Sequence, residues 1–309
     1  PMKNDLRDRA VIDATAELID VFQLTLLTAS QELPSTRCIS HASLVPIIQR
    51  TQKALTSGTF RTYSAVRIIA VLESAELLRR LPLTSPRGRP VKIYVLGFNE
   101  TSQPSALEVM QAYRPAGTLC YFSALELHGL TTQPTPHYHL AEFRPGIASS
   151  AVEPPAESSD KPQSLGVEVF TLEDVKCFLT SRDPNNLQGI QRRQLHSQCT
   201  VRVTTLEQTL LDCLHRPRSA GGPAVVFEAW ASGLPRSNAA KLWALLDSIQ
   251  NPNLMRRAGY MLEYHQTTSA LLDQIRSALR GFPTDQPPES LLPGIPYSNT
   301  ANDWHLRTP

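Results

Sequence analysis

The stretch RVTTLEQTLLDCLHRPRSAGG, residues Arg202–Gly222, carries the clearest structural signals in the chain. Val201 and Val203 alternate with polar neighbours, which predicts a strand leading into the stretch. Thr204 and Glu207 have the spacing of a capping box, so we expect a helix to begin there. Its apolar stripe is formed by Leu206, Leu210, Leu211 and Leu214.

The end of this helix is also marked. Pro217 stops it, and Gly221-Gly222 permits a sharp turn before another helix near Pro223. Glu207 and Asp212 are five residues apart and do not share a helix face. We therefore interpret Glu207 as a cap and Asp212 as a solvated or locally bonded residue, rather than as a catalytic pair.

Length and composition favour an ordinary two-domain protein. The chain has 309 residues, 41% of them hydrophobic. No apolar run approaches the roughly 18 residues of a membrane span, and no secretory leader is recognised. The five cysteines are scattered and never spaced C-x-x-C, which favours reduced thiols and a cytoplasmic location over disulfides or zinc.

Charge is distributed unevenly along the chain. Residues 1–97 carry 13 lysines and arginines against 8 acidic residues, whereas residues 98–309 carry 17 against 20. A basic N-terminal part on a slightly acidic remainder suits a nucleic-acid-binding domain joined to a second domain.

Three helices are predicted in the basic part. The first includes Val11–Leu26 and ends before Pro34, the second begins near Ser43, and the third runs from about Thr62 to Leu78. One line of the third helix is small or polar, as a helix in a DNA groove requires. A solvated helix face explains that line equally well. It consists of Tyr63, Arg67, Ala70 and Ser74.

A basic hairpin follows the third helix. Arg79-Arg80 precedes a Pro- and Gly-containing turn, and Val91–Leu96 alternates as a strand. Helix, turn, helix and hairpin are the order of a winged helix-turn-helix, which we predict for residues 1–97. We expect this domain to contact double-stranded DNA. The predicted contacts are Arg61, Thr62, Tyr63 and Arg67 from the third helix, with Arg79, Arg80, Arg87, Arg89 and Lys92 from the hairpin.

The fold class expected is therefore α+β, with residues 98–104 as a hinge and a mixed α/β domain over residues 105–309. Residues 144–163 are rich in proline and serine, which predicts a mobile insertion. The expected elements are helices at 105–113 and 173–179, strands at 137–143 and 167–171, two strands within 189–204, and helices at 223–231, 239–250, 253–264 and 268–280, with Ser237 as an N-cap.

Catalytic motifs are not recognisable. There is no phosphate-binding loop, G-x-S-x-G or H-E-x-x-H, and we expect neither enzymatic activity nor a cofactor. His137 and His139 would share one face of a strand, at a spacing compatible with two metal ligands. No further ligand is evident, so we predict no metal here. A metal-dependent nuclease built around this pair is the less favoured alternative.

Four segments, in the same order, resemble the AbiEi-type antitoxins of type IV toxin–antitoxin systems. They are YFSALELHGL (121–130), the opening stretch (202–222), LMRRAGYMLE (254–263) and DWHLRT (303–308). The similarity spans roughly residues 40–309 and is weakest before residue 110. It implies that the end of the chain, around Trp304, packs back as a strand.

The resemblance also implies a dual function. Such a protein represses its own operon at inverted repeats, as a monomer or dimer, and antagonises a nucleotidyltransferase-type toxin in phage defence. Arg192, Arg193, Arg256 and Arg257 are candidates for an exposed partner-binding surface, although each singly also fits a solvated charge. The alternative is a stand-alone winged-helix regulator without a toxin partner.

Overall fold

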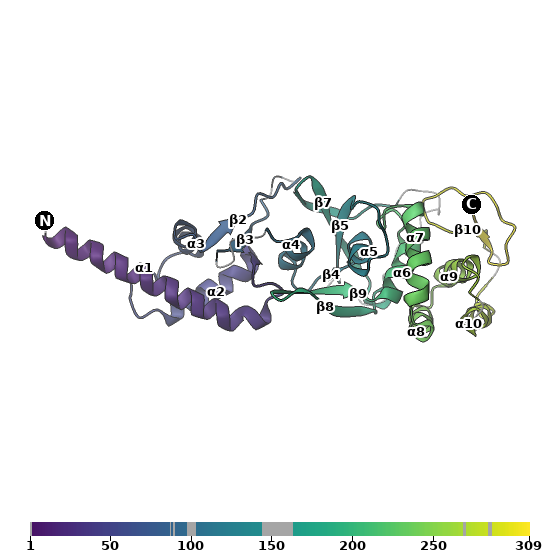
Figure 1. Ribbon diagram of the computed structural model, residues 1–309, viewed down its shortest axis with the longest axis horizontal. Helices are drawn as coiled ribbons and strands as arrows, with labels where there is room; N and C mark the ends of the chain where they lie inside the picture. Colours follow the sequence, from purple (N-terminus) through teal and green to yellow (C-terminus); the bar gives the residue numbers. More distant parts are fainter. Residues whose placement is uncertain are drawn as a thin grey trace. The chain divides into compact units, whose positions relative to one another are not determined.

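The computed structural model describes residues 2–86, 88, 90–97, 103–143, 163–267, 270–283 and 286–309, with backbone alone for residues 2–8. The chain forms two compact units (Figure 1). The first comprises residues 1–115 and 194–201, and the second comprises residues 116–193 and 202–309. The predicted hinge at 98–104 falls within the first unit, and its residues 98–102 lie outside the described residues.

Mixed α+β structure is found in both units. The first unit contains α1 (Met2–Ala29), η1 (Ser30–Glu32), β1 (Cys38–Ser40), α2 (His41–Ala54), α3 (Ala65–Ser74), β2 (Leu78–Arg80), β3 (Ile93–Leu96) and α4 (Ala106–Tyr113). β1, β3 and β2 form an antiparallel sheet with β3 in the centre. The hairpin predicted from Arg79-Arg80 and Val91–Leu96 is thus confirmed as the β2–β3 pair.

The third helix is shorter than predicted. Ser64 is its N-cap, because its side chain accepts a hydrogen bond from the backbone N–H of Arg67, and α3 ends at Ser74. Arg61, Thr62 and Tyr63 therefore lie in the turn before the helix. α3 buries Ile68, Ile69 and Leu72 against α1 and α2.

The second unit is built around a six-stranded sheet of order β6-β7-β5-β4-β9-β8. Its strands are β4 (Thr118–Leu119), β5 (His137–Phe143), β6 (Val167–Leu172), β7 (Val175–Arg182), β8 (Ile190–His196) and β9 (Cys199–Thr204). β5 and β7 are parallel, and β6 and β7 form a hairpin. Residues 194–201, which include the end of β8, the turn and the start of β9, belong to the first compact unit.

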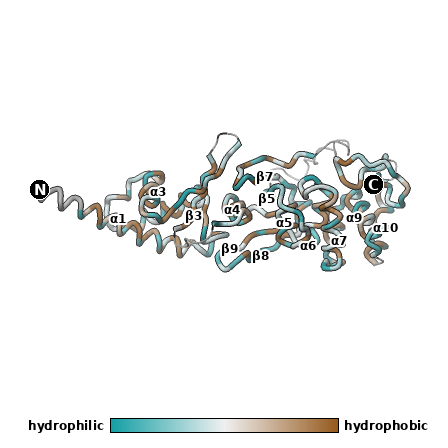
Figure 2. Tube along the Cα trace, turned by 45° about the horizontal axis from the view of Figure 1, so that its top comes forward, coloured by the Kyte–Doolittle hydropathy of each residue, from teal (hydrophilic) through white to brown (hydrophobic). Residues whose placement is uncertain are grey.

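The helices of the second unit supply most of its core. They are α5 (Phe122–His128), η2 (Pro184–Asn186), α6 (Leu206–His215), α7 (Pro223–Gly233), η3 (Leu234–Arg236), α8 (Ala239–Ile249), α9 (Pro252–Tyr264) and α10 (Ala270–Leu279). Hydrophobic and hydrophilic residues both occur along the labelled helices of this unit in Figure 2, as in amphipathic helices. The tail forms a short parallel pair, β10 (Glu289–Ser290) and β11 (Leu306–Arg307), so the predicted closing strand is confirmed.

Three local predictions are wrong. Residues 175–182 form strand β7 instead of a helix at 173–179, because Glu173 and Asp174 both adopt positive φ and close a hairpin. The helix after β9 is capped by Thr205, not Thr204. Asn238, not Ser237, caps α8. In both helices, the side chain of the residue after the predicted cap accepts the hydrogen bond from a free backbone N–H of the first turn.

Among the described residues, no helix is long and apolar enough to cross a membrane. All five cysteines are free and buried. The insertion predicted at 144–163 lies outside the described residues except for Gln163.

Candidate nucleic-acid interface

The turn between α2 and α3 is held by side-chain bonds to its backbone. The Gln52 amide donates to the carbonyl oxygens of Phe60 and Tyr63, each at 2.8 Å. The Arg61 Nε donates to the Leu55 carbonyl oxygen at 2.9 Å. The Arg61 bond satisfies a carbonyl at the end of α2, and the Gln52 bonds satisfy carbonyls of the connection that follows. The start of α3 is therefore held in place relative to α2.

α1 braces the same turn through one carboxylate. Glu17 accepts hydrogen bonds from the Thr56 side chain and from the backbone N–H groups of Thr56 and Ser57. The bonds from Ser57 and Thr56 lower the pKa of Glu17 to about 2. Glu17 therefore stays ionised even in acidic solution, and its hydrogen bonds order the chain leading to α3.

The outer face of α3 is open to solvent, as predicted. Arg67, Ala70 and Ser74 are exposed, so three of the four residues of the small and polar line are confirmed as exposed. Val66 is also exposed, at 63%, and was not anticipated. The signal was present, because Val66 is a large apolar residue outside the inward stripe of the helix.

Tyr63 does not belong to that exposed line. It is half-buried, and its ring packs edge-on against Phe60 with the centroids 5.1 Å apart. The Arg67 guanidinium lies over the Tyr63 ring, 5.4 Å from its centroid. Tyr63 is thus positioned to orient Arg67. Two further residues predicted to reach DNA lie in the turn. Thr62 is exposed, and the Arg61 guanidinium donates two hydrogen bonds to the Leu55 carbonyl oxygen.

The predicted hairpin contacts are only partly described. Arg79 and Arg80 are exposed on β2, and an Arg79 Nη2 lies 3.4 Å from the Gln103 side-chain oxygen. Lys92 is half-buried. Burial lowers the pKa of His41, and the Lys92 charge adds to this effect. Arg87 and Arg89 lie outside the described residues.

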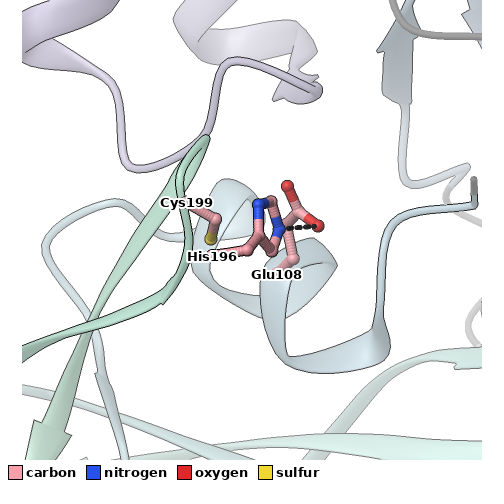
Figure 3. Close-up of side chains that lie close together, drawn as sticks. All are labelled: Glu108, His196 and Cys199. Atoms are coloured by element: carbon pink, nitrogen blue, oxygen red, sulfur yellow. Dashed lines mark hydrogen bonds and ion pairs between the residues drawn. The ribbon is translucent and has the colours of Figure 1, made fainter.

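A second polar cluster in the first unit joins Glu108, His196 and Cys199 (Figure 3). Glu108 is fully buried, and its carboxylate lies 3.2 Å from His196 Nε2 and 3.8 Å from the Arg37 guanidinium. Ser35 donates to its other oxygen at 2.5 Å. Burial and the Glu108 charge raise the pKa of the Cys199 thiol to about 12.

These contacts complete a buried ion-pair network. The Gln198 backbone N–H donates to His196 Nδ1 at 3.2 Å, so a neutral ring carries its proton on Nε2, facing Glu108. The Arg37 Nη1 lies 3.4 Å from His196 Nε2. A metal at Nε2 would have to displace both the proton and the Arg37 charge. The cluster therefore stabilises the packing of residues 194–201 against Ser35 and α4, and Glu108 and His196 already have partners.

His137 and His139 share a face of β5, as predicted, but that face is buried. The His139 ring stacks on Phe178 with centroids 5.4 Å apart, and both of its nitrogens lack a hydrogen-bond partner. Burial lowers the pKa of both histidines. Among the described residues, no carboxylate or thiol joins this pair in a ligand set.

Of the two interpretations of Asp212, the solvated one is wrong and the locally bonded one is confirmed, because the Gln208 amide one turn earlier donates to Asp212 Oδ1 at 3.0 Å. Asp212 is 1% exposed and accepts a hydrogen bond from the Arg182 guanidinium at 3.0 Å, which makes a buried ion pair. Arg182 also donates to the Tyr121 hydroxyl and the Asn186 carbonyl oxygen. Burial is the largest single effect and opposes the Arg182 charge, but the Asp212 charge and hydrogen bond, together with the neighbouring Tyr121 and Cys120, raise the pKa of Arg182 overall. Glu207 caps a different segment than predicted, since it accepts from the Asn238 N–H at 2.9 Å.

The expected partner-binding arginines divide into two pairs. Arg192 and Arg193 are exposed on β8, an edge strand of the sheet. Arg256 and Arg257 are 8% and 7% exposed, so their predicted place on an exposed surface is wrong. Arg257 donates to the Ser290 carbonyl oxygen at 3.1 Å and connects α9 to β10. Burial lowers the pKa of Arg257 to about 10.

Comparisons with solved structures include a distant likeness. No family model matches the chain, and no curated protein matches its sequence. The RV2827C protein from Mycobacterium tuberculosis, a crystal structure, aligns with a TM-score of 0.47 at 14% identity. The alignment covers 85% of this chain and 82% of that one. At this similarity it carries no argument about function.

Proposed function

We propose that the first unit binds double-stranded DNA as a winged helix-turn-helix domain. The observation that supports this most is the order α1, β1, α2, α3, β2, β3 with a sheet order of β1-β3-β2. α2 and α3 are joined by a braced connection, residues 55–64, and α3 presents an open face with Arg67. In this domain class, such a helix enters the major groove and the hairpin contacts the phosphate backbone.

The proposal extends to a repressor that acts on its own operon. Support for this step comes from the resemblance to AbiEi-type antitoxins in the sequence, together with the positive charge of residues 1–97. Footprinting of the full-length protein on DNA upstream of its gene tests the proposal. We expect protection of inverted repeats and a steep loss of affinity with salt. Four to six phosphate contacts give a log–log slope of roughly −4 to −5.

The full chain is the right reagent for this test. Ser35 pairs with Cys199 in an antiparallel bridge, and the buried Glu108 belongs to the same unit, so a fragment that ends near residue 100 lacks part of its fold. Arg79→Ala with Arg80→Ala should weaken binding to all sequences by a similar factor. Lys241→Ala, at an exposed position of α8, is the matched control. Binding that does not depend on salt contradicts the proposal.

We further propose that the second unit antagonises a nucleotidyltransferase-type toxin. This proposal rests on the resemblance of residues 121–130, 202–222, 254–263 and 303–308, and on Arg192 and Arg193 at an exposed sheet edge. The test is co-expression with the neighbouring gene. Full-length protein with Arg67→Ala, Arg79→Ala and Arg80→Ala should still restore growth. Rescue that requires DNA binding would place the protective effect in repression, and a chain without a toxin gene beside it would favour the stand-alone regulator.

A further inference from the structure

One large apolar side chain stands on the open face of α3. Val66 is 63% exposed, and it is the only large hydrophobic residue so exposed among the described residues of α2, α3 and β1–β3. The core of the unit is filled by Ile68, Ile69 and Leu72 from the same helix. A single exposed valine is common on protein surfaces. Its significance here comes from its position.

Val66 is the second residue of α3, and Arg67 is the third. The Ser64 cap fixes the backbone at this end, and a β-branched side chain in a helix has one strongly preferred χ1 rotamer. The valine methyl groups therefore point in a defined direction. The N-terminal residues of a groove-binding helix are those that reach base edges.

Arg67 is oriented by its neighbours. Its guanidinium lies over Tyr63, whose ring packs on buried Phe60, and the Gln52 amide holds the Tyr63 carbonyl oxygen. This arrangement reduces the rotamer freedom that Arg67 would lose on binding. Ala70, one turn further on, is small and exposed, so it leaves room for the groove wall.

The chemistry of these two side chains selects particular bases. In the major groove only thymine presents a methyl group, and guanine presents the O6 and N7 acceptors that suit an arginine. A rigid valine beside an oriented arginine matches a thymine close to a guanine. When a base pair is reversed, its methyl group or its two acceptors no longer lie at the same position in the groove.

We propose that Val66 and Arg67 form a reading pair for a thymine methyl group and a neighbouring guanine, with Tyr63 as the positioning residue for Arg67. This inference rests on the proposed DNA-binding function. It adds a chemical specificity to the face of α3 and assigns Tyr63 a role that requires no base contact.

The experiment uses full-length protein and duplexes selected from a random-sequence library. Replacement of thymine by deoxyuridine removes only the methyl group, and replacement of guanine by 7-deazaguanine removes only the N7 acceptor. The deoxyuridine duplex should bind the native protein about three- to fivefold more weakly, as expected for the loss of one buried methyl contact. Val66→Ala should remove that difference and leave the 7-deazaguanine effect intact. Leu24→Ala on α1, also 63% exposed, is the control.

Tyr63 is tested by its conservative variant. Tyr63→Phe keeps the ring under Arg67 and should keep guanine selectivity, whereas Tyr63→Ala should lose it with an unchanged salt slope. If both the native protein and Val66→Ala bind selectively and lose the same affinity on deoxyuridine duplexes, this inference is overturned and the proposed DNA-binding function is not. Complete absence of salt-dependent DNA binding by folded protein overturns the proposed function as well, and so separates the two failures.

Discussion

The exposed surface formed by α3 and β2 and the buried interior of the second unit use arginine for opposite purposes. In the first, Arg67, Arg79 and Arg80 are exposed and leave charge available to solvent. In the second, Arg182 and Arg257 are buried and hold segments together, at Asp212 and at Ser290. The number of arginines in a stretch therefore says little about its function. What decides is whether the surrounding fold supplies a partner that offsets the loss of hydration.

The largest effect should come from breaking the buried pair of the second unit. Asp212→Ala leaves the Arg182 charge buried without its carboxylate, and we expect a loss of about 3–5 kcal/mol in the free energy of unfolding. Urea denaturation followed by circular dichroism measures it. Glu168→Ala removes the partner of Lys176, whose side chain is 58% exposed, and should cost less than about 1 kcal/mol. Equal losses in the two variants would remove the distinction between buried and exposed pairs.

Much of the second unit was predictable because its signals are local. The alternation at Val201 and Val203, the leucine stripe of α6 and the glycines after Pro217 each act within a few residues. The ion pair was not predictable in this way, because Arg182 and Asp212 lie 30 positions apart. Helix periodicity identifies the face on which Asp212 lies but does not identify what packs there. The β6–β7 turn was missed because Glu173 and Asp174 adopt positive φ without a glycine.

The features of the candidate interface likewise divide into those that local sequence signals predicted and those that they did not. The exposed line of α3 followed from helical spacing, since the inward stripe of Ile68, Ile69 and Leu72 fixes the opposite face. The length of α3 did not follow from helical spacing. The spacing predicted a start at Thr62, but the Ser64 cap makes α3 begin at Ala65. Arg256 and Arg257 were expected on the surface because charged residues usually lie there.

A second prediction concerns the tail that Arg257 helps to hold. A Cβ atom on Gly259 would lie 2.1 Å from the Trp304 ring, which is 3% exposed. Gly259→Ala should therefore displace the ring and lower stability by about 1–3 kcal/mol. Tryptophan fluorescence during unfolding measures the change. Gly58→Ala, with open space at its Cβ position, should have a much smaller effect. A native-like transition in Gly259→Ala would show that the tail does not pack on α9.

The buried histidines give the second unit a pH dependence that exposed arginines cannot give. Burial lowers the pKa of His139 well below 6.5, so the folded chain keeps this ring neutral. The unfolded chain binds a proton below about pH 6.5, and stability falls as the pH decreases from there. The slope is at most about 1.4 kcal/mol per pH unit for one histidine.

His139→Phe preserves the packing on Phe178 and removes this titration. Its stability should change less between pH 7.5 and about pH 5.5 than that of the native protein, by roughly 1 kcal/mol. Urea titrations at both pH values measure the difference. An unchanged pH profile would show that His139 takes up its proton equally well in the folded chain.

The smallest effect on stability is expected at Arg192 and Arg193. Both are exposed on edge strand β8, and their replacement by alanine should change the free energy of unfolding by no more than about 0.5 kcal/mol. Arg257→Ala is the contrasting variant, because it removes the bond to Ser290 and should destabilise the tail measurably. On the proposed antitoxin function, the double variant should fold normally yet protect cells less well in co-expression. Full protection by the double variant would exclude these two arginines from the toxin-binding surface. Clear destabilisation would instead mean that β8 depends on them for its own packing, and the contrast between exposed and buried arginines would then fail at this strand.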